Sequence, residues 1–151
     1  MRVIAVGKIK DKQLEGLLAD YQKRIKAFCS LEIVEIAEQA DNNDKERAIA
    51  LESQAIRDRI KSKEYVVLLD LQGQMLDSLD LADKLDKWLV NNSKLCFVIG
   101  GSNGVDEILK ERVDYLWKLS DLTFPHQLVR LLLLEQLYRC FKINNKHKYH
   151  K

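Results

Sequence analysis

The sequence predicts an α/β fold, a single domain with a mainly parallel sheet and helices on both faces. Short apolar runs alternate along the chain with stretches whose apolar residues recur every three or four positions, so strands alternate with amphipathic helices. Two of the runs, 65–69 and 95–99, are almost wholly apolar, which is typical of strands covered on both sides. The length of 151 residues suits one domain with a substantial core, and we expect that domain to span 1–151.

The expected elements follow from these patterns in chain order. We expect strands at 3–6, 31–36, 65–69, 95–99 and 115–119, and helices at 12–28, 45–62, 78–91, 106–112 and 126–142. Asp44 and Ser78 are the expected N-caps of the second and third helices. Residues 70–74 are expected to form the turn after the third strand.

Composition and cysteine content exclude several classes of protein. No apolar run approaches the roughly 18–20 residues that a membrane-spanning helix needs, and the first residues lack the layout of a signal peptide. We therefore expect a cytoplasmic protein with no membrane partner. Cys29, Cys96 and Cys140 lie far apart among apolar residues, so we interpret them as reduced, buried thiols and predict no metal site. The net charge of +2 does not by itself indicate a nucleic-acid partner.

Two loops are the candidate site. The run 95–99 ends in Gly100 and Gly101, and a third glycine follows at Gly104. Glycines let the backbone approach a ligand closely, and in open α/β sheets ligands bind at the carboxyl ends of strands. The only proline, Pro125, fixes a second loop just before the last helix. From these residues alone, a plain strand-to-helix turn and a ligand site both remain open.

The last helix, 126–142, is apolar around nearly its full circumference. Such a helix must be buried on all sides. In a chain of this size, a terminal helix can lie against the sheet on one side only. We therefore expect a homodimer through this C-terminal helix, with burial under the preceding loops as the alternative.

The order and spacing of these motifs resemble the ribosomal large-subunit pseudouridine methyltransferase H family, within the SPOUT class of S-adenosylmethionine enzymes. The resemblance covers the whole chain. It is carried by Phe97-Val98-Ile99-Gly100-Gly101-Ser102-Asn103-Gly104, Leu122-Thr123-Phe124-Pro125-His126-Gln127, Arg130, Glu135-Gln136, Tyr138-Arg139 and Tyr149-His150. It implies a deep C-terminal trefoil knot, which periodicity could not indicate, and dimerisation through the last helix.

The resemblance also implies a pocket for S-adenosylmethionine made of three loops that hold the adenosine largely by backbone groups. The matching positions are Leu69, Gly100, Gly101, Leu119, Ser120, Asp121, Leu122, Thr123 and Phe124. An apolar pocket with a few orienting backbone groups suits a cofactor whose methyl group sits on a sulfonium cation.

Two residues near these loops are candidates for the chemical step, in which the weakly acidic N3 of pseudouridine loses a proton. His126 lies in the first turn of the last helix, and its alternative role is to cap that helix or to form a hydrogen bond within the loop. Arg130, one turn later, would stabilise negative charge on a uracil oxygen, and its alternative role is a salt bridge to the partner subunit.

The C-terminal end is basic, with no acidic residue after Glu135. On sequence alone a solvated tail is the better interpretation. The resemblance implies instead that Tyr149 and His150 reach the active site of the other subunit, although Lys148 stands where many relatives have a small residue or proline. The expected RNA-binding residues are Arg139, Lys142, Lys146, Lys148 and Lys151.

The function implied is N3 methylation of a pseudouridine in 23S rRNA, on assembled 70S ribosomes. A chain this small has no separate RNA-binding domain, which fits recognition of the ribosome by docking. The first alternative is a non-catalytic ribosome- or RNA-binding protein with the same fold. The second is a monomeric nucleotide-binding domain of flavodoxin-like topology, which the absence of a phosphate-binding loop motif disfavours.

Overall fold

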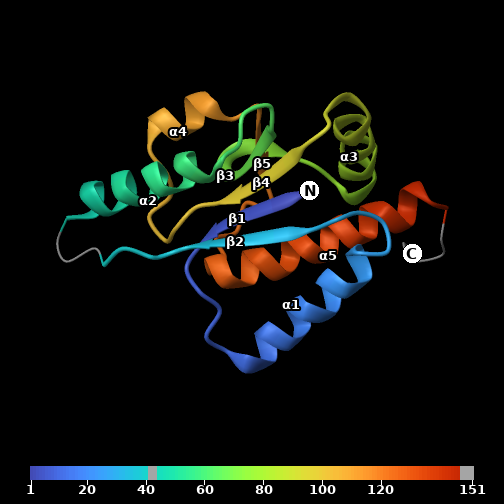
Figure 1. Ribbon diagram of the computed structural model, residues 1–151, viewed down its shortest axis with the longest axis horizontal. Helices are drawn as coiled ribbons and strands as arrows, with labels where there is room; N and C mark the ends of the chain where they lie inside the picture. The colour runs from blue at the N-terminus through green and yellow to red at the C-terminus, as the bar shows by residue number, and fades with distance from the viewer. Residues whose placement is uncertain (41–43, 147–151) are drawn as a thin grey trace.

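The computed structural model describes residues 1–40 and 44–146, and its strands and helices alternate along the chain (Figure 1). The elements are β1 (Arg2–Val6), α1 (Lys12–Ile25), β2 (Glu32–Ile36), α2 (Lys45–Arg59), β3 (Tyr65–Met75), α3 (Ser78–Asn91), β4 (Leu95–Ile99), α4 (Glu107–Arg112), β5 (Tyr115–Lys118) and α5 (His126–Asn144). The sheet has the order β2-β1-β4-β3-β5, and every pair of neighbours is parallel. The predicted α/β class and parallel sheet are confirmed.

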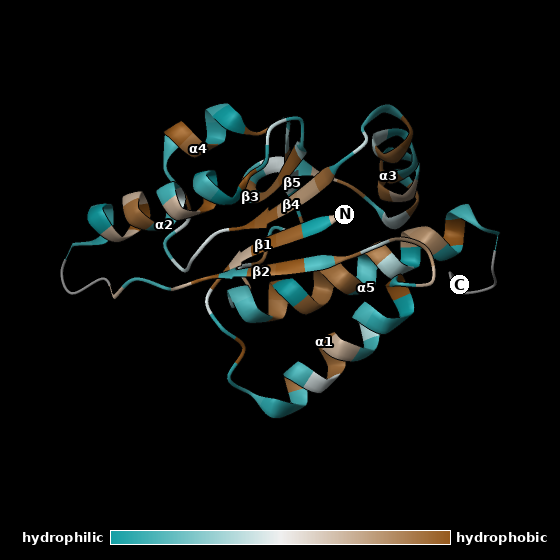
Figure 2. Cartoon of the chain, in the orientation of Figure 1, coloured by the Kyte–Doolittle hydropathy of each residue, from teal (hydrophilic) through white to brown (hydrophobic). Residues whose placement is uncertain are grey.

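Helices cover both faces of the sheet, as predicted. Successive residues of β1 point to opposite faces, so Val3 and Ala5 join one core while Ile4 and Val6 join the other. The first core is closed by α1, α3 and α5, and the second by α2 and α4. In Figure 1, α2 and α4 lie together on one side, and α5 lies beside α1 on the other. Hydropathy follows this arrangement, because the strands are mostly brown in Figure 2.

Aspartates begin four of the five helices. Asp11, Asp44, Asp77 and Asp106 each accept a backbone N–H of the first turn. The prediction of Asp44 is confirmed, whereas that of Ser78 is wrong by one residue. The Asp77 carboxylate accepts from the amides of Leu79 and Asp80 at 2.9 and 2.8 Å, so Ser78 is already helical. Its hydroxyl instead donates to Gln136 of α5 at 3.0 Å.

The third strand is longer than predicted. Residues 70–74, expected as a turn, belong to β3, whose pairing with β5 shifts register between Leu69 and Gln74. Gly73 makes this path possible, because it passes directly against the backbone of β5. A Cβ on Gly73 would lie 2.6 Å from the carbonyl carbon and oxygen of Leu116 and 2.7 Å from the carbonyl carbon of Trp117. The other predicted elements are present, with ends that differ by a few residues.

Gly73→Ala is therefore expected to destabilise the protein by about 1–3 kcal/mol, because neither strand backbone can yield without breaking its pairing. The change would appear as a lower midpoint in urea unfolding. Gly16→Ala in α1 is the control, since a Cβ there meets nothing within 4 Å. Alanine within a helix should instead stabilise the protein by about 0.5–1 kcal/mol. Equal effects of the two changes would contradict the close approach at Gly73.

Candidate functional site

A cavity of about 740 Å³ opens at the carboxyl ends of β4 and β5, beside residues 69–72 of β3. Three chain segments, 69–72, 99–105 and 119–126, form most of its wall, and Lys110 and Val129 complete it. Because the strands are parallel, their carboxyl ends lie at the same edge of the sheet. That edge is where open α/β sheets bind ligands.

The glycine turn after β4 forms one wall of this cavity. It is closed by a hydrogen bond of 3.1 Å from the Gly104 amide to the Gly101 carbonyl. Gly104 has φ of +86°, a left-handed conformation that side chains other than glycine rarely adopt. The turn therefore needs glycine at this position.

Eight of the nine positions proposed for cofactor binding line the cavity. They are Leu69, Gly100, Gly101, Leu119, Ser120, Leu122, Thr123 and Phe124. The ninth, Asp121, is exposed and forms an ion pair with Lys118, outside the wall. Leu122 is 67% exposed, so it lies at the rim. Three segments that are distant in sequence thus meet around one space, which is the arrangement that the resemblance implies.

One polar part of the wall was missed by the sequence analysis. Lys110 of α4 lies 3.0 Å from Gln72 Oε1 and 3.7 Å from Asp70 Oδ2, and it also pairs with Glu107 at 3.1 Å. Lys110, Asp70 and Gln72 all line the cavity. Nothing in the sequence links positions forty residues apart, because the contact depends on how α4 packs beside β3.

His126 lines the cavity at the start of α5. Its Nδ1 lies 3.3 Å from Ser102 Oγ, and Ser102 donates to Glu38 Oε1 at 3.3 Å. Its Nε2 is buried and bonds to no protein atom of the described residues. The ring packs on Gly7, where a Cβ would lie 2.6 Å from Nε2. The structure thus brings His126 to the glycine turn.

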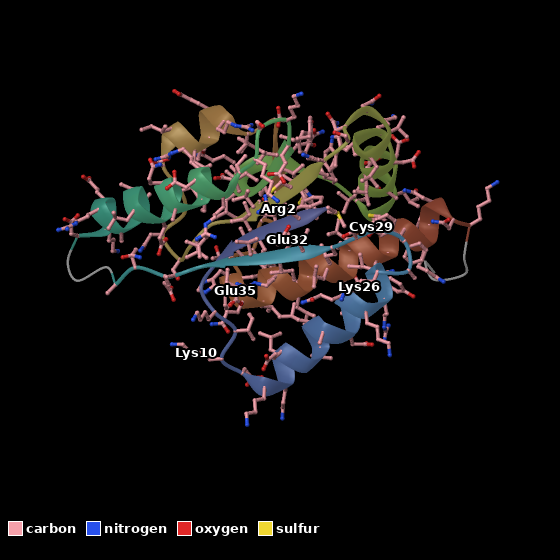
Figure 3. All side chains as sticks on the ribbon, viewed as in Figure 1. Arg2, Lys10, Lys26, Cys29, Glu32 and Glu35 are labelled. Carbon is pink, nitrogen blue, oxygen red and sulfur yellow. The ribbon has the colours of Figure 1, made fainter. Side chains whose placement is uncertain are left out.

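Arg130 lies away from the cavity. Its side chain is buried and forms an ion pair of 2.6 Å with Glu35 of β2, which Figure 3 labels beside the start of α5. Its Nη2 donates to the carbonyls of Gly7 and Val6 at 2.7 and 3.4 Å. The alternative role predicted for Arg130 was a salt bridge to the partner subunit, whereas the carboxylate that it pairs with belongs to its own chain, and Arg130 does not line the cavity.

Three of the five expected RNA-binding residues, Arg139, Lys142 and Lys146, lie at the far end of α5. Arg139 pairs with Glu135 at 3.0 Å, and Lys142 and Lys146 are in or just after the last turn. Lys146 and His126 are about 30 Å apart along the helix. Lys148, Tyr149, His150 and Lys151 lie outside the described residues.

The cysteines are free thiols, with Cys96 and Cys140 buried and Cys29 partly exposed. Burial raises the pKa of both Cys96 and Cys140 to about 12, so these thiols stay protonated at neutral pH. Neither lies in the wall of the cavity.

In the described part of the chain, no helix combines the length and apolar character needed to cross a bilayer.

Comparison with known proteins decides the family. A model described as predicted SPOUT methyltransferase matches residues 1–150. The chain belongs to the SPOUT methyltransferases. It is 43% identical to the ribosomal RNA large subunit methyltransferase H of Acetivibrio thermocellus, over 99% of this chain and 98% of the relative. The proteins of the same name from Fusobacterium nucleatum and Desulfitobacterium hafniense are 42% and 41% identical, over 100% of this chain and 99% and 98% of theirs.

Membership of the SPOUT methyltransferases confirms two expectations. SPOUT methyltransferases take the methyl group from S-adenosylmethionine, and their fold carries a trefoil knot at the C-terminal end. The cavity suits this cofactor, because it combines apolar side chains with backbone groups at the Gly100-Gly101 turn and with the polar group around Lys110.

Proposed function

We propose that this protein methylates N3 of a pseudouridine in 23S rRNA, with S-adenosylmethionine as methyl donor. The observation that carries the proposal is the cavity itself. Its three walls are the segments in which the family resemblance places the cofactor, and they meet at one edge of the sheet. We further propose that residues 1–151 act as one domain in the cytoplasm, on assembled 70S ribosomes.

The cavity suits an in-line transfer. S-adenosylmethionine supplies an electrophilic methyl group on a sulfonium, so that an N–C bond forms as the S–C bond breaks and S-adenosylhomocysteine leaves. The apolar wall, with Leu69, Leu119 and Phe124, would bury the adenosine. Holding nucleophile, methyl carbon and sulfur in line can remove several kcal/mol of the barrier, up to roughly 7–11.

His126 is the residue of the cavity best placed to receive the proton from N3. It lines the cavity, and its Nδ1 faces Ser102 rather than a backbone group. An imidazole can accept a proton near neutral pH, which few other side chains can do. Arg130 would act indirectly, because its bonds to Gly7 and Glu35 hold the first turns of α5 against β1 and β2.

A homodimer through α5 would complete the site. Leu128 of α5 is 38% exposed, and Met75 and Leu79 are 55% and 54% exposed. Met75 and Leu79 are close in sequence to Ser78, whose hydroxyl bonds to Gln136 of α5. A second copy would cover this apolar surface.

The length of α5 gives a second reason for the dimer. The tail that carries Tyr149 and His150 begins about 30 Å from His126 of the same chain. Two copies packed through α5 in opposite directions would bring each tail to the cavity of the other. Arg139, Lys142, Lys146, Lys148 and Lys151 would then neutralise rRNA phosphates beside that cavity.

Methyl incorporation from labelled S-adenosylmethionine tests the function. The purified protein would be given unmodified 70S ribosomes, free 50S subunits or naked 23S RNA. Label on a pseudouridine of 70S particles alone is the expected result. Absence of label in all three, with cofactor binding still measurable by calorimetry, would contradict the substrate. Ribosome binding without cofactor binding would favour the non-catalytic alternative.

Deletion of residues 149–151 is expected to abolish turnover and leave cofactor affinity unchanged. The reason is that none of the described residues after Val129 lines the cavity, whereas the deletion removes Tyr149 and His150, the proposed target-binding groups. Calorimetry and the ribosome assay measure the two properties separately. Lys151→Ala is the control, because it removes one cation and keeps Tyr149 and His150. Full turnover in the deletion variant would show that the tail is dispensable.

A further inference from the structure

Glu52 is a buried carboxylate for which the proposed function has no role yet. It belongs to α2, and its side chain is 5% exposed. The other buried glutamate of the described residues, Glu64, pairs with Arg2 at 2.9 Å. For Glu52, no lysine or arginine of the described segments provides such an ion pair. It accepts one hydrogen bond of 2.8 Å, from the Gln39 amide to Oε1. Burying a carboxylate without an ion pair costs free energy, so a group that interacts with Glu52 is expected nearby.

The second carboxylate oxygen points toward the edge of the cavity. A Cβ on Gly101 would collide with Glu52 Oε2 and would lie 3.3 Å from Val6 Cγ1. Glu52 therefore lies directly behind the glycine turn, on the side that Gly101 leaves open. Glycine at this position leaves room for the carboxylate as well as for a ligand.

His126 reaches the same place from the opposite face of the sheet. Its ring packs on Gly7, the residue after Val6, while α5 covers the face that α2 does not. Side chains from opposite faces can meet only beyond the ends of the strands. At the ends of the neighbouring strands β1 and β4, Gly7 and Gly101 have no side chains to separate them.

The two groups interact electrostatically. Burial raises the pKa of Glu52, while the Gln39 hydrogen bond and the charge of His126 lower it and that of Glu38 raises it. The other charged groups near His126 have partners of their own. Glu38 reaches it through Ser102, and Arg130 is paired with Glu35. Glu52 is therefore the buried carboxylate near His126 that no lysine or arginine of the described residues pairs with.

We propose that Glu52 is a positioning residue for His126, coupled to it by charge across the glycine gap at the ends of β1 and β4. The carboxylate stabilises the positive charge that the His126 imidazole gains when it receives the proton from the substrate. This role rests on the proposed function, because it makes His126 the proton acceptor. The electrostatic interaction between Glu52 and His126 does not need substrate, so it can be measured in the free protein.

Two NMR measurements on the free protein test the couple without substrate. In Glu52→Gln, the ¹⁵N shifts of the His126 ring should change, because the neighbouring negative charge is lost. In His126→Gln, the carboxyl ¹³C titration of Glu52 should move to higher pH, because the charge of His126 no longer lowers the pKa that burial raises. Unchanged ¹⁵N shifts and an unchanged titration would overturn the proposal.

Activity gives a third measurement. Glu52→Gln should lower the rate of methyl transfer by about 10- to 100-fold and leave cofactor affinity unchanged, as expected for loss of a group that orients a catalytic histidine. Glu46→Gln, an exposed glutamate in the first turn of α2, is the matched control and should change nothing. If Glu52→Gln does not fold, the titration of Glu52 in the wild type and in His126→Gln decides the question. If NMR shows the interaction between Glu52 and His126 but the wild-type protein transfers no methyl group, the proposed function is refuted and the interaction is not.

Discussion

His126→Ala is expected to lower the rate of methyl transfer by a factor of about 10² to 10⁴, the usual loss when a general base is removed. Cofactor affinity should change little, because His126 is one of many residues in the wall of the cavity. The measurement is single-turnover methyl transfer on unmodified ribosomes, with calorimetry for the cofactor.

The control for this variant is Gln127→Ala. Gln127 is in the same helical turn but does not line the cavity, so its removal should leave the rate unchanged. A His126→Ala variant that keeps its rate would contradict the assignment of the proton acceptor. One that loses cofactor binding as well would instead give His126 a structural role in the pocket.

Arg130→Ala is expected to lower the free energy of unfolding by about 3 kcal/mol. The substitution removes a buried side chain and leaves the carbonyls of Gly7 and Val6 without their donor. The value lies at the low end of the range for buried pairs, because the Glu35 side chain is 36% exposed and water can replace its partner. Urea unfolding followed by circular dichroism measures the change.

Lys87→Ala provides the comparison, since Lys87 pairs with Asp83 on the exposed side of α3. Such pairs contribute little to stability, so this variant should unfold like the wild type. Similar unfolding of both variants would show that the bonds of Arg130 do not anchor α5 to the sheet.

Much of the fold was predictable because each element carries its own local signal. The apolar runs of β3 and β4 predicted buried parallel strands, and the glycines after β4 predicted a turn at the edge of the sheet. The extension of β3 beyond Leu69 was missed because its cause lies in β5. Residues 70–75 stay in the sheet through their pairing with β5, where the Leu116 backbone passes close to Gly73.

The parts of the site that local sequence motifs form were predictable. The parts that depend on contacts between elements packed across the sheet were not. The segments 99–105 and 119–126 were found because each contains its own glycine or proline signal. Arg130 follows His126 by one turn, yet it points to Glu35 because α5 crosses the ends of β1 and β2 at that point. Glu52 gave no signal, since a glutamate in a charged helix looks like any solvated residue until the strand order places it behind Gly101.

The strand order also determines when the chain can fold during its synthesis. β1 is an interior strand of the sheet, and one of its two neighbours is β4, so Arg2 cannot pair with Cys96 until β4 has been synthesised. The core on the α1 side closes later still, because α5 supplies Leu133, Leu134 and Leu137. The nascent chain therefore exposes an apolar sheet face until translation is almost complete, and a truncated product that ends before residue 126 should aggregate.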